Sequence, residues 1–130
     1  MTVDANESVI GRWLAAGDAG RFDRFAGLLH DDVVVHAPGG LSTSSRGDEV
    51  AVWRAATEAM PDLRHEVQDI LAGDGIEMAR VVVTGTLRRD FGGIAARNQR
   101  LRFDQAVIAH LRDGRIAEAW EIVDLSGPVA

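Results

Sequence analysis

The sequence predicts an α+β fold, with helices in the first half of the chain and strands in the second. Up to residue 60, apolar residues recur at intervals of three and four; from residue 64 they form β-rich runs separated by short turns. The first pattern is typical of amphipathic helices and the second of an antiparallel meander. Helices followed by strands are the order of α+β proteins. No internal repeat or low-complexity segment occurs, so residues 1–130 are expected to form a single domain.

Three helices are expected before the strands. The first covers residues 7–16 and has Asn6 as its cap, and the second covers residues 21–29 after Asp18. Asn and Asp are preferred caps because their side chains accept hydrogen bonds from the free N–H groups of the first turn. The third helix covers residues 48–60 and ends at a proline. These helices supply one apolar layer for the sheet to pack on.

The strands are expected to be connected by tight turns and one long loop. A short strand over residues 33–36 lies between the second and third helices. The later strands are expected at residues 64–72, 76–87, 101–112 and 115–125, with a loop over residues 88–100. The last two flank Asp113-Gly114, and an Asp-Gly pair between β-rich runs is a strong hairpin signal.

The register of this last hairpin decides which side chains share a face. A strict two-residue loop pairs Arg112 with Arg115 and places His110 and Asp124 on opposite faces. A three-residue loop with a bulge at Gly114 shifts the pairing by one residue and places both on one face. The second register also gathers the large apolar residues of the hairpin together, so it is favoured. A His and an Asp facing one cavity form an acid/base pair.

Composition excludes several classes of function. The net charge is −6 and the basic residues are scattered, which argues against nucleic acid as a partner. No apolar run approaches the roughly 20 residues of a membrane span. The chain has no cysteine, no cluster with metal-ligand spacing and no phosphate-binding glycine motif, so neither a metal nor a cofactor is expected. Without a recognisable signal peptide, a cytoplasmic location is favoured.

Five sequence blocks, taken in order, resemble a known family. They are Ala16-Gly17-Asp18, Asp32-Val33-Val34-Val35-His36, Met60-Pro61-Asp62-Leu63, Gly85-Thr86-Leu87, and residues 113–120 with Asp124. Together they resemble the SnoaL-like polyketide cyclases of the nuclear-transport-factor-2-like (ketosteroid-isomerase-like) superfamily. The resemblance implies a cone-shaped roll, in which N-terminal helices pack on a strongly curved, mostly antiparallel sheet that encloses a pocket. It also implies a homodimer formed through the outer face of the sheet.

The resemblance also implies a chemistry. In these cyclases an Asp near the C-terminus is the general acid/base, helped by a His fourteen residues earlier, which corresponds to Asp124 and His110 here. The implied reaction is a cofactor-independent aldol-type cyclisation or isomerisation. Its substrate would be a small apolar or aromatic carbonyl compound, polyketide-like or polycyclic.

Further side chains are candidates for substrate contact. His36 closes an apolar strand where this superfamily often has a polar pocket residue. Arg80 interrupts an apolar strand and would either bind the substrate or, as we favour, pair with a neighbour in the sheet. His30 and His65 lie at element ends and are expected to be solvated. The expected pocket wall consists of Trp13, Trp53, Met60, Phe91 and Trp120, although aromatic residues at such spacing also form plain cores.

Other functions of the same fold stay open. A non-catalytic ligand-binding or dimerising module is the main alternative, because a fold does not determine a function. A polyketide hydroxylase resembles the cyclases too closely to be separated from them. An epoxide-hydrolase-like site is disfavoured, because the Asp expected two residues after Arg80 is Val82, and a ketosteroid-isomerase-like Tyr donor is absent.

Overall fold

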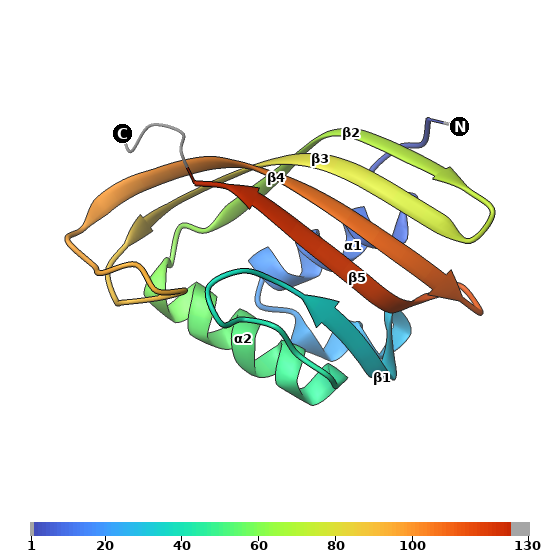
Figure 1. The fold of residues 1–130 in the computed structure, drawn as a ribbon, viewed down its shortest axis with the longest axis horizontal. Coiled ribbons are helices and arrows are strands. Elements are labelled where there is room, and N and C mark those ends of the chain that lie inside the picture. Colours follow the sequence, from blue (N-terminus) through green and yellow to red (C-terminus); the bar gives the residue numbers. More distant parts are fainter. Residues whose placement is uncertain (1, 126–130) are drawn as a thin grey trace.

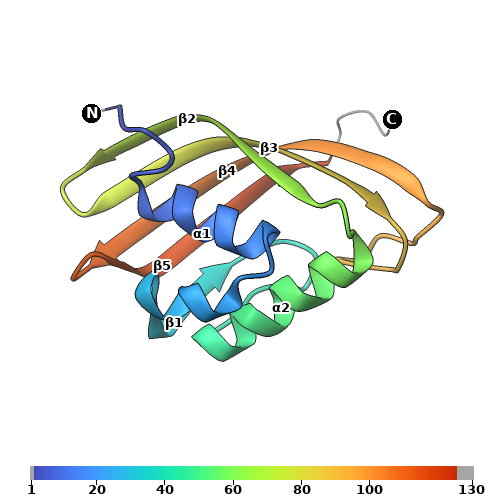
Figure 2. The same ribbon diagram turned by 180° about the vertical axis from the view of Figure 1, so that it is seen from behind.

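A computed structural model describes residues 2–125 of the chain as an α+β fold, in which helices cover one face of a five-stranded sheet (Figures 1 and 2). The elements are α1 (Val9–Asp18), the 3-10 helix η1 (Phe22–Gly27), β1 (Leu29–His36), α2 (Arg46–Ala59), β2 (Arg64–Gly73), β3 (Ile76–Leu87), β4 (Gln99–Arg112) and β5 (Arg115–Asp124). Within residues 2–125, no helix combines the length and the apolar character needed to cross a membrane.

The sheet is mixed, in the order β1-β5-β4-β3-β2. β1 runs parallel to β5, and the other neighbouring pairs are antiparallel. The sheet arches over the helices, but β1 and β2 stay at separate edges (Figure 2). The mostly antiparallel character is therefore confirmed, whereas the strong curl of a cone is not present.

The helix starts differ from the expected ones. The cap of α1 is Ser8, not Asn6: its Oγ accepts from the backbone N–H of Gly11 at 2.9 Å. Two further free N–H groups of this first turn, those of Val9 and Ile10, donate to the buried carboxylate of Glu77. This long-range contact from β3 satisfies the first turn, and a local pattern cannot reveal it.

The segment expected as a second helix is only partly helical. Phe22–Gly27 forms a 3-10 helix, and the chain then enters β1 at Leu29, four residues before the expected strand. The early start follows from pairing with β5, because Leu29 lies opposite Ile116 and the backbone N–H of Ile116 donates to the carbonyl of Leu28.

The Asp-Gly hairpin is present, but its register arises in an unexpected way. Asp113 and Gly114 have φ values of 54° and 75°, which is the geometry of a two-residue type I′ turn, and Arg112 pairs with Arg115. The expected bulge at Gly114 is therefore wrong. Instead, the register shifts by one residue just beyond the turn, which leaves Ala117 as the extra residue of β5.

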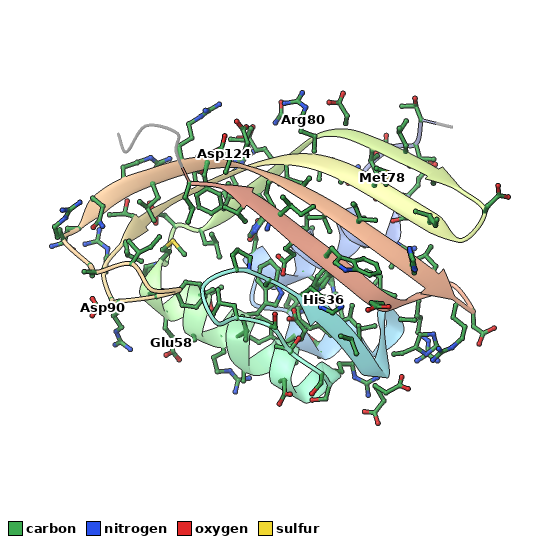
Figure 3. All side chains as sticks on the ribbon, viewed as in Figure 1. His36, Glu58, Met78, Arg80, Asp90 and Asp124 are labelled. Atoms are coloured by element: carbon green, nitrogen blue, oxygen red, sulfur yellow. The ribbon has the colours of Figure 1, made fainter. Side chains whose placement is uncertain are left out.

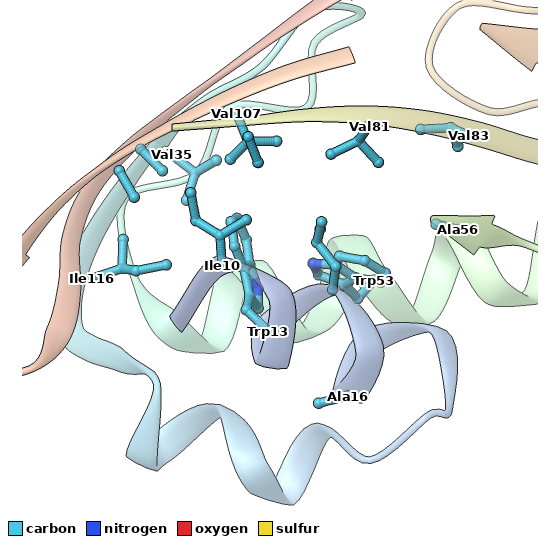
Figure 4. Packing of buried hydrophobic residues seen from close by; sticks show 14 of the residues in the cluster. Ile10, Trp13, Ala16, Val35, Trp53, Ala56, Val81, Val83, Val107 and Ile116 are labelled. Atoms are coloured by element: carbon cyan, nitrogen blue, oxygen red, sulfur yellow. The ribbon is translucent and has the colours of Figure 1, made fainter. Parts of the chain in front are cut away.

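The core fills the space between the sheet and the N-terminal helices. Figure 4 shows Ile10 and Trp13 of α1 below the sheet strands that carry Val35 and Val107. All four side chains are fully buried. Trp13 therefore belongs to the core, which was the alternative to its expected place in a pocket wall.

Candidate functional site

His110 and Asp124 share one face of the hairpin, but it is the outer face of the sheet. His110 lies opposite Glu118, and Asp124 lies opposite Asp104. Both residues are exposed. Their positions differ by six residues along the strands, which corresponds to about 20 Å. The prediction that they form one pair facing a cavity is therefore wrong.

The inner face of the hairpin carries small residues at two of its central positions. Ala109 and Ala119 are fully buried there. The larger Ile108 and Trp120 pair with each other on the outer face. Gathering the large apolar residues therefore does not identify the inner face of this hairpin.

The outer face holds its own polar cluster around Trp120. The ring of His36 stacks on Trp120 at 5.3 Å, and its Nε2 lies 2.7 Å from Oε2 of Glu118. His110 packs edge-on against the same indole, with ring centroids 4.8 Å apart. His36 and Trp120 therefore lie away from the pocket for which they were expected.

Arg80 is also on the outer face. Its Nε donates to Oδ2 of Asp69 on β2 at 2.8 Å, and both side chains are exposed. The favoured interpretation, a pair with a sheet neighbour, is confirmed. Figure 3 labels Arg80 on β3 and Asp124 at the end of β5.

A pocket lies on the opposite side of the sheet, bounded by α2 and two loops. Its volume is about 160 Å³ and its wall is largely apolar. Trp53, Met60 and Phe91 line it, as the sequence predicts. The other pocket-wall candidates, Trp13 and Trp120, are not among the described lining residues.

Two glycines allow the walls of the pocket to close. A Cβ at Gly17 would meet the ring of Trp53 at 2.4 Å, so the glycine lets this indole pack on α1. At the mouth, Gly39 has φ 70°, and a Cβ there would lie 2.5 Å from the carbonyl oxygen of Gly92. The loop after β1 and the loop before β4 therefore touch each other beside the pocket.

Glu121 is the first acid/base group that lines the pocket. It lies on β5 between outward-facing neighbours, opposite Val107, and its Oε2 accepts from Nε2 of Gln105 at 3.0 Å. Burial raises the pKa of Glu121 to about 8; the charge of Glu49 raises it further, and the Gln105 hydrogen bond lowers it. Glu121 is therefore mostly protonated at neutral pH.

Glu49 is a second carboxyl in the same wall, and it is only 1 % exposed. Its Oε1 accepts from Oγ1 of Thr43 at 2.8 Å. Thr43 is itself held by two backbone hydrogen bonds to Val35. Burial raises the pKa of Glu49 to about 7, while hydrogen bonds from Thr43 and Trp53 lower it. Two carboxyl groups thus face one small cavity.

A His-Asp pair completes the polar part of the pocket. His65, at the start of β2, lines the cavity, and its Nδ1 lies 2.7 Å from Oδ1 of Asp18 at the end of α1. Oδ2 of Asp18 also accepts from the backbone N–H of His65 at 2.6 Å. Because a carboxylate only accepts, Nδ1 carries the hydrogen of this contact, and in the neutral ring Nε2 has a free lone pair. The expectation that His65 and His30 are solvated is wrong, because both are buried.

Sequence reasoning missed all three titratable groups of the pocket, although one left a signal. Glu49 lies on the same helical face as Trp53 and Met60, which were expected in the pocket wall. An acid on such a face is a candidate for a buried functional group. Glu121 and His65 gave no local signal, since only the register of β5 and the contact with α1 bury them.

The geometry brings an acid and a base to one apolar cavity. A protonated carboxyl donates a hydrogen bond or a proton, and an imidazole held by a carboxylate accepts one. Both functions are needed to convert a carbonyl compound into its enolate and to protonate that enolate again.

Known proteins share this fold and sequence pattern. The family model described as SnoaL-like polyketide cyclase matches residues 7–130. The crystal structure of IdmH from Streptomyces antibioticus, a candidate polyketide cyclase, is 27% identical, with a TM-score of 0.75 and 89% of each chain covered. TsrD from Streptomyces laurentii is 22% identical, with a TM-score of 0.82, covering 96% of this chain and 93% of its own. AclR from Streptomyces galilaeus, a candidate hydroxylase, is 24% identical, with a TM-score of 0.72, covering 90% of this chain and 77% of its own. No curated protein matches the chain.

Proposed function

The chain belongs to the SnoaL-like polyketide cyclase family, and from that premise we propose that it carries out cofactor-independent acid/base chemistry on a small carbonyl compound. The reaction is an aldol-type cyclisation or an isomerisation. Glu121 is the general acid, and His65 is the general base. This pair replaces Asp124 and His110 in the roles that the family resemblance implies.

The proposed reaction begins with removal of a proton from a carbon beside the carbonyl group. Nε2 of His65 takes this proton, and Asp18 holds the ring in the required tautomer. Glu121 donates a hydrogen bond to the carbonyl oxygen, where negative charge develops, and keeps its proton in this step. In a cyclisation the resulting enolate attacks a second carbonyl, and the new alkoxide takes the proton of Glu121. Exchange with solvent then returns a proton to Glu121 and removes the proton held by His65. In an isomerisation, His65 returns its proton to another carbon.

One observation carries this proposal: a carboxyl with a pKa of about 8 lines the same cavity as an imidazole whose Nδ1 is bonded to a carboxylate. A general acid is most effective when its pKa lies near the working pH. The apolar wall strengthens these interactions because it excludes water.

The test uses 2-tetralone, a two-ring ketone, in D₂O. Proton NMR measures the rate at which the hydrogens on the carbons beside its carbonyl group are replaced by deuterium. The wild-type protein is expected to accelerate exchange. Because a positioned acid or base contributes about 10²–10⁴-fold, Glu121→Gln and His65→Gln are each expected to lose at least about 100-fold. A rate that survives both substitutions would overturn the assignment. Binding of 2-tetralone without exchange by the wild-type protein would mark a binding module.

We also infer that the outer face of the sheet pairs with a second copy of the chain. A row of outer-face residues crosses all five strands, because each lies opposite the next: Leu71, Met78, Ile108, Trp120 and His36. Leu71 and Met78 are about half exposed, which is unusual for large apolar side chains in a continuous row. Figure 3 shows Met78 and His36 on widely separated strands of this face.

Light scattering after gel filtration tests this pairing. The wild-type protein should elute at twice the chain mass of 14.0 kDa. Met78→Glu places a charge within the row, and it should give a monomer with unchanged secondary structure. A wild-type protein that stays monomeric at high concentration would contradict the inference.

A further inference from the structure

One polar atom of the pocket has no partner. Gln105 is 6 % exposed and lines the cavity, and its Nε2 donates to Glu121. Its Oε1 has no hydrogen-bond partner among the residues that the structure describes. A buried carbonyl oxygen without a hydrogen-bond donor is destabilising. A ligand that brings an O–H or N–H group to this oxygen removes that penalty.

The charge of the pocket restricts the ligand further. Glu49 and Glu121 both line the cavity, and no arginine occurs among its described lining residues. The chain has no lysine at all. His65 is already paired with the carboxylate of Asp18. A carboxylate or phosphate would therefore enter an apolar site next to acidic groups without a counter-ion, which is unfavourable.

The size of the cavity sets a limit on the ring system. Its volume of about 160 Å³ is close to the roughly 150 Å³ of an engineered apolar cavity that binds benzene. The aromatic side chains of Trp53, Phe91 and Phe103 in the wall suit a flat, apolar ring. One ring or two fused rings fill this space, and a third ring would extend beyond it toward the mouth.

We propose that the pocket selects an uncharged ligand of one or two fused rings that bears a hydroxyl group, a phenol or an enol, whose O–H donates to Oε1 of Gln105. This inference rests on the proposed function only in taking the pocket as the substrate site. It narrows the polycyclic substrates that the family resemblance implies to small hydroxylated rings. It also assigns separate roles. Gln105 recognises the hydroxyl group by a hydrogen bond, and the carboxylate of Glu49 disfavours binding of anions.

Calorimetric titration with three matched probes tests the selection at pH 8, above the pKa of about 7 of Glu49, so that this carboxyl group is mostly ionised. 2-Naphthol offers the donor, 2-methoxynaphthalene keeps the rings without the donor, and 2-naphthoate replaces the hydroxyl by an anion. The hydroxyl probe is expected to bind at least about tenfold more tightly than either of the others, the usual effect of one hydrogen bond to a buried acceptor. 2-Hydroxyanthracene should bind at least about tenfold more weakly than 2-naphthol. Equal binding of 2-naphthol and its methyl ether, of 2-naphthol and 2-naphthoate, or of the two- and three-ring phenols would overturn the proposal.

Two substitutions assign the selection to its residues. Gln105→Leu should bring 2-naphthol and its methyl ether within about twofold of each other, with the affinity of the ether unchanged. Glu49→Gln should raise the affinity for 2-naphthoate and leave the preference for 2-naphthol over the ether intact. Thermal unfolding establishes that each variant is folded, and Glu49→Gln provides an independent test if Gln105→Leu is not. Wild-type preferences in both variants would overturn the proposal.

These outcomes are separable from those of the proposed function, because binding requires no proton transfer. If the hydroxyl preference holds and 2-tetralone does not exchange, only the proposed chemistry fails. If exchange is catalysed without that preference, only the ligand selection fails.

Discussion

The two faces of the β4–β5 hairpin carry the same kinds of side chain in very different surroundings. On the inner face, Glu121 is half-buried beside the buried Gln105 and lines an apolar cavity. On the outer face, Asp124 and Asp104 lie opposite each other and are exposed. Burial next to a second acid raises the pKa of Glu121 to about 8. The face of the strand on which a carboxyl group lies therefore decides whether that group serves as an acid near neutral pH.

The largest difference between the faces is expected in stability. Ile116 is fully buried on the inner face of β5, and Ile122 is 58 % exposed on the outer face. Ile116→Ala should lower the free energy of unfolding by about 2–5 kcal/mol because it leaves a cavity. Ile122→Ala should change it by less than about 0.5 kcal/mol. Urea unfolding at low protein concentration measures both, and equal losses would contradict the assignment of the faces.

The buried carboxyls should make stability depend on pH in a defined direction. Between the ordinary value of 4.5 and the raised pKa of about 8, folded Glu121 keeps a proton that the unfolded chain has released. Its contribution to stability is therefore complete below about pH 4.5 and is lost as the pH rises through 8. Glu121→Gln cannot ionise, so its stability relative to wild type should be about 4 kcal/mol greater at pH 9 than at pH 5. The same difference at both pH values would contradict the raised pKa.

A smaller effect is expected from the residue that orients His65. Asp18→Asn removes the charge that selects the Nδ1–H tautomer, so the maximal rate of 2-tetralone exchange should fall about tenfold or more. Since Asp18 does not line the pocket, the ketone concentration at half-maximal rate should stay nearly constant. An unchanged maximal rate would show that Asp18 has no part in catalysis.

The smallest effect is expected on the outer face. Asp124→Asn is the matched counterpart of Glu121→Gln, a loss of charge on the same strand but on the opposite face. Exchange of 2-tetralone should stay within about twofold of wild type, as is usual for surface substitutions. A loss as large as that of Glu121→Gln would return the site to the outer face and restore the family-like role of Asp124.

Much of the fold follows from local patterns. The Asp-Gly turn at residues 113–114 adopts the positive φ values that such a pair favours. The helical stripe of Trp53 and Met60 faces the pocket as expected, and Phe91 lies in the loop that completes the wall. Arg80 has the sheet partner that a charge within an apolar strand requires. In each case the signal lies within a few residues of the structure that it predicts.

The site was not predictable in the same way, because distant contacts determine it. The extra residue at Ala117 exchanges the two faces of β5 beyond the turn, and no turn signal marks it. The small Ala109 and Ala119 lie on the inner face of the hairpin and the larger Ile108 and Trp120 on the outer face, so hydrophobicity alone selects the wrong side. His65 is held by Asp18, 47 residues away in the chain. Only the assembled fold shows that these groups meet.

Infrared spectroscopy of the carboxyl stretch tests most directly whether Glu121 is a protonated acid at neutral pH. The wild-type protein should show a protonated-carboxyl band at pH 7, in which the component of Glu121 disappears with a midpoint near pH 8 and that of Glu49 with a midpoint near pH 7. Glu121→Gln should remove the component with the midpoint near pH 8. Glu49→Gln should move this midpoint to lower pH, because the Glu49 charge helps to hold the proton. Asp124→Asn should leave the band unchanged. A spectrum with no protonated carboxyl above pH 7.5, or a component with a midpoint near pH 8 that survives Glu121→Gln, would contradict the assignment of this proton to Glu121.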